Sequence, residues 1–246
     1  MNDINPFKSY YHKNIINWSY KDIVLISVFL FLIQFVYGII LGVVGVLFLK
    51  DKSNLLIYVN STFFILYFFF FIWLIFYKYK ISAESLKLVK NKHNFKNIFI
   101  GIIFGLVFQT LFYIFSSIYP NLFSDDYLKY FDLNLVRPFT LIISALTLIF
   151  LVPFIEEVFF RGILFQKLKG SFSLWIALTI QSFFFTLTHF QYFSSIYIIF
   201  IFILGIVAGI IYHWTNSLKT AVYFHITYNL VWFVWLTYYL KDQGEI

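Results

Sequence analysis

The sequence predicts an all-α membrane protein, a polytopic bundle of about seven transmembrane helices. Hydrophobic residues occupy 61% of the 246 positions and charged residues only 12%, which is too little polar surface for a soluble globule. The apolar runs are long, and they do not alternate as the strands of a membrane barrel do. Because a backbone in lipid must satisfy its own hydrogen bonds, we expect these runs to be helices.

The predicted elements follow one another with short connections. Residues 1–22 mix lysines with aromatic and aliphatic side chains, which suits an extra interfacial helix as well as a frayed tail. Segment 82–88, in a lysine-rich connection, is expected to start a short surface helix. No internal repeat or soluble domain is visible, so residues 1–246 are expected to form one membrane domain. The seven expected spans are 23–49, 55–77, 98–119, 138–168, 172–190, 196–214 and 218–240.

The distribution of charge predicts orientation rather than nucleic-acid binding. With seven spans, thirteen of the 18 lysines and arginines lie on the side of the N-terminus, which the positive-inside rule places in the cytoplasm. A composition rich in Phe, Ile, Lys and Asn is typical of an AT-rich bacterial genome, so we expect a multi-pass protein of a bacterial plasma membrane. Its first partner is therefore membrane lipid.

Three pairs of glycines are spaced four residues apart within expected spans: Gly38/Gly42, Gly101/Gly105 and Gly205/Gly209. Small residues at this spacing let helices approach closely in lipid, so we expect all three pairs to mediate packing within the bundle. The chain has no cysteine, which excludes disulfides, thiolate metal ligands and a cysteine nucleophile.

Charged residues inside one apolar run single out a candidate site. Glu156 and Glu157 are the only acidic residues within the expected spans, and Arg161 follows them. Two histidines, His189 and His225, lie well inside other spans. An ionised side chain at the centre of a membrane helix costs about 2.5–3.5 kcal/mol, so these groups need partners, water or a chemical task.

Helical spacing predicts how these side chains point. Glu157 and Arg161 share a face as an i, i+4 ion pair, whereas Glu156 points about 100° away. Pro153 lacks an N–H, and a bend is expected just before the two carboxylates. His225 and Asn229 repeat the i, i+4 spacing on the last span.

Carboxylate, imidazole and amide groups in one cavity could activate water, bind a divalent metal and stabilise an oxyanion. Hydrolysis of an amide needs the first and the last of these. Each group also has a structural interpretation. The Glu157–Arg161 pair alone could be a structural ion pair, each histidine could bond a backbone carbonyl, and Asn229 could join two helices.

Three motifs in order resemble the CAAX-processing and bacteriocin-processing (CPBP, or Abi) family of intramembrane peptidases. The family pattern is Glu-Glu-xxx-Arg, then Phe-xxx-His, then His-xxx-Asn/Asp on successive core helices. The sequence reads Glu156-Glu157-Val-Phe-Phe-Arg161, then Phe185-Thr-Leu-Thr-His189, then His225-Ile-Thr-Tyr-Asn229. The resemblance covers about residues 138–235, whereas the first three spans match only in general character.

The resemblance implies a role for each motif residue. Glu156 would be the general base, and His189 would help to activate the water. His225 and Asn229 would stabilise the tetrahedral intermediate, while Glu157 and Arg161 would brace the site. In a metal-dependent version of the mechanism, zinc would be held by Glu156, His189 and His225, although the sequence contains no His-Glu-xx-His motif.

The sequence thus predicts an intramembrane endopeptidase that cleaves a membrane-associated peptide or protein, with or without a divalent metal. One alternative is a non-catalytic membrane scaffold or a bacteriocin self-immunity protein. Another is a transporter that uses the same buried charges as a proton relay. The completeness of the three motifs favours the enzyme, and the sequence leaves the substrate and the oligomeric state open.

One geometric requirement accompanies this hypothesis. At about 1.5 Å per residue, Glu156 lies roughly 18 Å from Leu168, whereas His189 lies roughly 26 Å from Phe172. The two side chains reach the same depth only if the helices are tilted, protrude unequally or are broken. A separation above about 10 Å would count against a shared catalytic centre.

Overall fold

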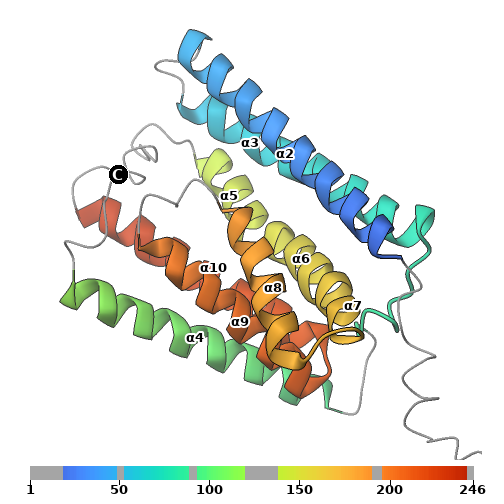
Figure 1. Ribbon diagram of the computed structural model, residues 1–246. Coiled ribbons are helices and arrows are strands. Elements are labelled where there is room, and N and C mark those ends of the chain that lie inside the picture. Colours follow the sequence, from blue (N-terminus) through green and yellow to red (C-terminus); the bar gives the residue numbers. More distant parts are fainter. Residues whose placement is uncertain (1–18, 49–52, 89–92, 120–137, 190–195, 243–246) are drawn as a thin grey trace, which may run out of the picture.

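The computed structural model describes residues 19–48, 53–88, 93–119, 138–189 and 196–242. Within these ranges the only regular elements are helices, which confirms the all-α bundle (Figure 1). The expected interfacial segment 1–22 lies outside the described residues except for its last four. The helices are α2 (Tyr20–Phe48), α3 (Ser53–Ile72) with η1 (Trp73–Lys78), α4 (Asn94–Ile118), α5 (Pro138–Leu146), η5 (Thr147–Leu151), α6 (Val152–Glu157), η6 (Val158–Phe165), α7 (Gln166–Lys169), α8 (Leu174–Leu187), α9 (Tyr197–Thr215) and α10 (Leu218–Asp242).

The described residues form seven helical rods, in agreement with the sequence prediction, but the rods differ in their suitability to cross a membrane. By length and composition, five stretches of the described chain are suited to a span: Tyr20–Ile40, Val59–Lys78, Asn94–Ile118, Phe139–Lys169 and Tyr197–Thr215. Helix α8 has 14 residues, or about 21 Å, which is shorter than the roughly 30 Å of hydrocarbon. Helix α10 has 25 residues but is not among the five.

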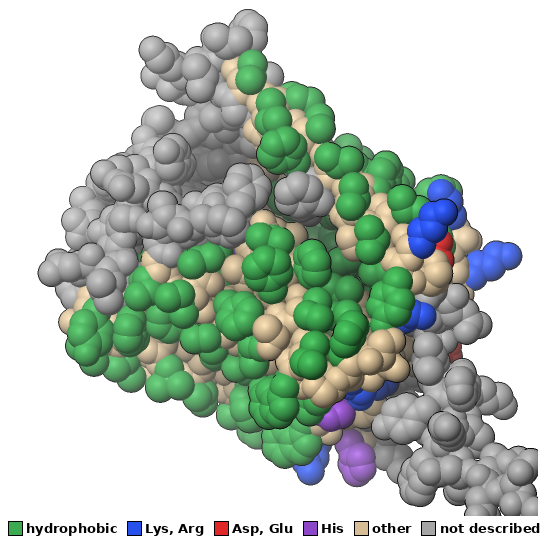
Figure 2. Space-filling model, viewed as in Figure 1, with side chains coloured by type: hydrophobic (Ala, Val, Ile, Leu, Met, Phe, Trp, Pro, Cys, Tyr) green, Lys and Arg blue, Asp and Glu red, His purple; other side chains and the backbone are tan. Residues whose placement is uncertain are grey.

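The helices surround the rod that carries the two glutamates. Helices α2 and α3 lie side by side on one flank, α4 and α10 pack together on the other, and α5–α7 run between them with α8 alongside (Figure 1). Among the described residues on the face that Figure 2 shows, hydrophobic side chains predominate, and basic side chains lie near the start of α2. This distribution suits a belt of lipid around the bundle.

Two of the three glycine pairs bring helices into close contact. A Cβ atom added at Gly101 or Gly105 of α4 would lie 2.5–2.7 Å from backbone or side-chain atoms of α10. At Gly205 and Gly209 of α9 it would lie 2.5–2.9 Å from side chains of α8. The expectation is wrong for Gly38, where nothing lies within 4 Å of an added Cβ, because α2 contacts the bundle through another face.

These contacts predict a position-dependent effect of a single methyl group. We expect Gly105→Ala to lower the thermal unfolding midpoint, because overpacking of this kind costs about 1–3 kcal/mol. The new Cβ would lie 2.7 Å from the carbonyl oxygen of Phe224 and from Cβ of Thr227. Gly38→Ala is the matched control and is expected to leave the midpoint unchanged or to raise it slightly. Equal midpoints for the two variants in detergent would contradict this packing.

The rod from Pro138 to Lys169 is continuous but changes its helical register twice. Helices α5, α6 and α7 are separated by the π-helical turns η5 and η6. The first π turn ends at Leu151, two residues before Pro153, where the missing N–H and the bulk of the ring disturb an α-helix. π turns inside α-helices are rare and frequently occur at functional sites.

The lysine-rich connection packs against the end of this rod. Segment 82–88 forms hydrogen-bonded turns instead of the expected helix. The N–H of Leu86 donates to Ser82 O and that of Lys87 to Glu84 O, but Lys87 has a positive φ of 59°, at which a right-handed helix cannot continue. Leu86 is completely buried, and its Cδ2 lies 2.9 Å from the position of a Cβ on Gly162. The burial of Leu86 therefore holds segment 82–88 against the rod, whereas the sequence predicted a short helix lying on the surface.

Lys87 in this connection predicts a pH dependence of stability. Its ammonium group donates to Asn216 Oδ1 and lies 5.1 Å from the ring centre of Tyr212. Burial, and secondarily the charge of Lys169, lowers the pKa of Lys87 from 10.5 to about 8. Unfolded Lys87 therefore binds more protons between these values, so the stability of the fold increases as pH rises from about 8 to 10.5. We expect this increase to be absent from Lys87→Met in thermal unfolding, and equal slopes would contradict it.

Candidate active site

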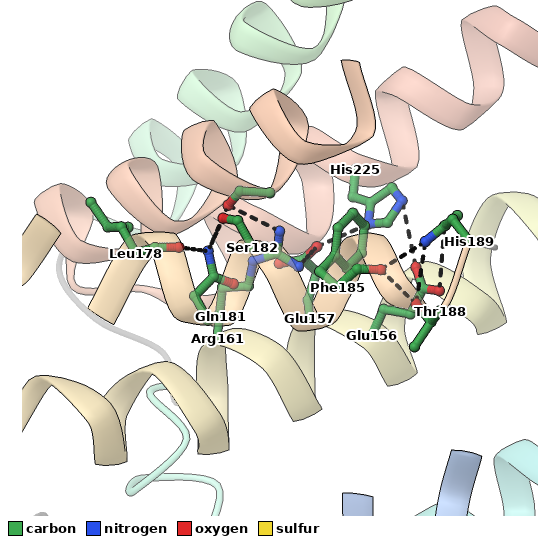
Figure 3. A network of polar contacts seen from close by, with 11 residues as sticks. Glu156, Glu157, Arg161, Leu178, Gln181, Ser182, Phe185, Thr188, His189 and His225 are labelled. Carbon is green, nitrogen blue, oxygen red and sulfur yellow. Dashed lines mark hydrogen bonds and ion pairs between the residues drawn. The ribbon is translucent and has the colours of Figure 1, made fainter. Parts of the chain in front are cut away.

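Three rods bring the predicted residues together. Glu156 and Glu157 end α6, Arg161 lies in η6, His189 follows α8, and His225 lies in α10 (Figure 3). The side chains point toward one another, and dashed lines connect them into a single polar network. Residues separated by up to 69 positions thus form one cluster of ionisable side chains inside a largely apolar bundle.

Glu157 is the buried centre of the network. Its Oε1 accepts from Arg161 Nη1 at 2.8 Å and contacts His225 Nδ1 at 2.9 Å. The side chains of Glu157 and Arg161 are both 0% exposed, so the ion pair is fully desolvated. A carboxylate in this environment needs both partners, since the loss of either would leave a buried charge.

Arg161 is held by further groups that sequence reasoning missed. Its Nη2 donates to the carbonyl oxygen of Gly205 at 3.3 Å, and its guanidinium lies 4.6 Å from the ring centre of Phe185. Gln181 Nε2 donates to the same Gly205 carbonyl at 2.9 Å, and the Gln181 side chain is completely buried. In the sequence, only the glutamine inside an apolar run could have indicated these contacts. The Gly205 carbonyl could not, because every residue has a backbone carbonyl.

Glu156 lies at the more open end of the network. Its Oε1 is 3.9 Å from His189 Nε2, and its Oε2 is 3.7 Å from His225 Nε2. The side chains of Glu156 and His189 are 17% and 19% exposed, whereas His225 is 4% exposed. Adjacent glutamates therefore have different surroundings, with Glu157 sealed and Glu156 accessible to a small molecule such as water.

Both imidazole rings are anchored through Nδ1. His189 Nδ1 lies 2.9 Å from the carbonyl oxygen of Phe185, and His225 Nδ1 contacts Glu157. These acceptors favour a proton on each Nδ1, which leaves each Nε2 facing Glu156 with a lone pair. The Phe185 ring lies between the histidines, 4.8 Å from the ring of His189 and 5.9 Å from that of His225.

The requirement of equal depth is therefore met. The Nε2···Oε1 distance of 3.9 Å between His189 and Glu156 is far below the 10 Å that would separate two sites. Helix α8 begins at Leu174 and ends at Leu187, and it packs beside η6 and α7. His189 lies just past the end of α8, beside Glu156 of α6 (Figure 3).

Asn229 lies apart from the carboxylates. Its Nδ2 donates to the carbonyl oxygen of Leu148 at 2.8 Å, which joins α10 to the π turn before Pro153. This is the helix-joining contact that the sequence allowed as an alternative. The catalytic role implied by the resemblance stays a prediction for this residue.

The donor atoms only partly match a metal site. Two imidazole nitrogens and a carboxylate are common zinc ligands, and tetrahedral ligands at about 2.0–2.2 Å from the metal lie about 3.3–3.5 Å apart. The observed separations of 3.7 and 3.9 Å are longer. Within the described ranges, no group of three or more His, Cys, Asp or Glu side chains is arranged to hold a metal ion. As arranged, these residues do not fit zinc.

The fold and the cluster define a multi-pass membrane protein with a buried carboxylate–histidine centre. Residues 138–231 match the family model described as type II CAAX prenyl endopeptidase Rce1-like. This match confirms the resemblance to the CPBP peptidases over the stretch that holds every motif residue, and it supports a CAAX-type intramembrane protease kind of function. Among curated proteins and among solved structures, none matches the chain.

Proposed function

We propose that the protein is an intramembrane endopeptidase in which Glu156 activates water for attack on a peptide bond. The observation that carries the proposal is the position of Glu156, whose two oxygens face His189 and His225 at 3.9 and 3.7 Å. These gaps exceed a direct hydrogen bond, and a single water between the groups would span them. The partial exposure of Glu156 and His189 gives such a water access.

The chemistry follows from the surroundings of each group. Glu156 takes a proton from the water while His189 Nε2 accepts the second hydrogen bond and orients the oxygen lone pair toward the substrate carbonyl. His225 donates through Nδ1 to the buried Glu157 carboxylate, which fixes the direction of its ring. With a proton taken up from solvent on Nε2 before the attack, His225 would donate to the developing oxyanion. Glu156 would then pass the proton of the attacking water to the leaving amine as the C–N bond breaks.

The substrate class follows from where the site lies. Glu156 belongs to a stretch suited to a membrane span, so the scissile bond must reach a site enclosed by apolar helices. A membrane-associated peptide or protein meets this condition better than a soluble polypeptide does. With the N-terminus in the cytoplasm of a bacterial plasma membrane, as the lysine distribution predicts, cleavage would occur near the cytoplasmic side.

The test is cleavage of a panel of membrane-anchored peptides by the purified protein in detergent, read by mass spectrometry. We expect cleavage that persists after chelation, with sub-stoichiometric zinc in the same sample. If chelation abolishes cleavage and zinc restores it, the metal-free mechanism is wrong and a zinc-dependent one takes its place. If no peptide is cut with or without zinc, the endopeptidase proposal fails and a scaffold or immunity protein becomes the better interpretation.

A further inference from the structure

Pro153 leaves one carbonyl of the rod without a backbone donor. The N–H of Val152 donates to Thr147 O, which is the i−5 bond of the π turn. The next bond in this register would run from residue 153 to Leu148 O, and proline has no N–H. Inside a membrane bundle a neighbouring helix must then satisfy the free carbonyl.

Asn229 of α10 supplies the missing donor. Its Nδ2 donates to Leu148 O at 2.8 Å. One turn earlier on the same face of α10, His225 contacts Glu157 at 2.9 Å and faces Glu156 at 3.7 Å. A single face of α10 therefore contacts the rod at two places, the open π turn and the carboxylates.

We propose that Asn229 is a positioning residue, whose bond to the Leu148 carbonyl sets the register in which His225 faces Glu156. The expected effect on kcat rests on the proposed peptidase function. The expected effects on stability and on the position of α10 do not. The bond uses one N–H of the amide, so this positioning role is separate from any contact that the second N–H makes with the tetrahedral intermediate.

The π turn explains why this bond matters for the site. Helix α6 begins at the end of η5 and carries Glu156 only three residues after Pro153. Any rewinding of η5 rotates α6 about its axis and changes the direction of Glu156 relative to His225. Asn229 clamps the turn in its π register while it also holds α10 in place.

A double-mutant cycle between Asn229→Ala and Pro153→Ala tests the pairing. An alanine at position 153 restores a backbone N–H, so in the π register Leu148 O gains an i−5 donor from the rod itself. We expect Asn229→Ala alone to lower the unfolding midpoint by a few degrees and kcat by about tenfold or more, with KM changed less than kcat. Adding Pro153→Ala is expected to restore most of both losses.

A distance measurement supplies a readout independent of activity. Because the chain has no cysteine, cysteines at Ile142 and Val234, which are 57% and 56% exposed, can carry the only spin labels. We expect the distance between the labels to shift or broaden in Asn229→Ala and to return in the double variant. Pro153→Ala alone is the control and should keep the wild-type distance.

The outcomes separate this role from the alternatives. An equal fold-loss of kcat from Asn229→Ala in both backgrounds, with the label distance unchanged, would overturn the inference in favour of direct contact with the substrate. If Asn229→Ala misfolds in the wild-type chain but folds when combined with Pro153→Ala, the positioning role is supported. If it misfolds in both, the positioning role is wrong. If even the wild type cleaves nothing, the midpoints and distances still decide the inference while the proposed function fails separately.

Discussion

Replacement of Glu156 by glutamine is expected to abolish peptide cleavage while the bundle stays folded. Glutamine has nearly the size of glutamate and can occupy the space facing His189 and His225, but it cannot take a proton from water. General-base catalysis contributes about 10²–10⁴-fold, so kcat should fall by at least two orders of magnitude. The measurement is kcat of the two proteins on the same membrane-anchored peptide.

The matched control is Glu84→Gln, which removes the same charge from an exposed turn of the lysine-rich connection. We expect this control to cleave as the wild type does, and both variants to unfold within a few degrees of the wild type. Full cleavage by Glu156→Gln would sink the general-base role. A large loss of thermal stability in that variant would instead assign Glu156 to architecture.

Removal of the Arg161 side chain is expected to have the largest effect on stability. Arg161→Ala leaves Glu157 buried with only His225 as a partner, and breaking a fully buried pair costs about 3–5 kcal/mol. The variant also loses the bond to Gly205 O and the contact with the Phe185 ring. We expect low yield and a strongly lowered unfolding midpoint in detergent.

A second variant distinguishes the cost of an unpaired buried charge from the cost of lost packing contacts. Glu157→Gln combined with Arg161→Met removes both charges and fills the space with an apolar chain of similar length. Since replacement of a whole buried pair is far less harmful than removal of one member, we expect this double variant to be more stable than Arg161→Ala. If Arg161→Ala proves neutral for both stability and activity, the bracing role of the pair is wrong.

The parts of the site that follow local rules were predictable from the sequence. The i, i+4 spacing of Glu157 and Arg161 places them on one face, and the structure joins them at 2.8 Å. The meeting of His189, His225 and the glutamates was predicted from the cost of ionisable groups in lipid and from the resemblance of the motifs, because helical spacing within one span carries no information about its neighbours. The all-α fold followed from hydrophobicity alone.

Other features depend on contacts that only the assembled bundle creates. Two π turns interrupt the rod, and apart from Pro153 no residue pattern marks an i−5 register. Gly38 has the same spacing to its partner glycine as Gly101 has, yet open space surrounds it, because spacing does not tell which face meets a helix. The acceptor for Arg161 and Gln181 is a backbone carbonyl, which every residue possesses.

The internal pairing of Glu157 with Arg161 has a consequence for biosynthesis. Both residues leave the ribosome before Gly205 and His225 exist, so for part of synthesis each is the other's only partner among the network residues. Because they sit one turn apart on the same rod, the nascent segment can enter the membrane as a nearly neutral pair and avoids the cost of two separate ions. The later helices then complete a site in which one of the two carboxylates was already paired at insertion.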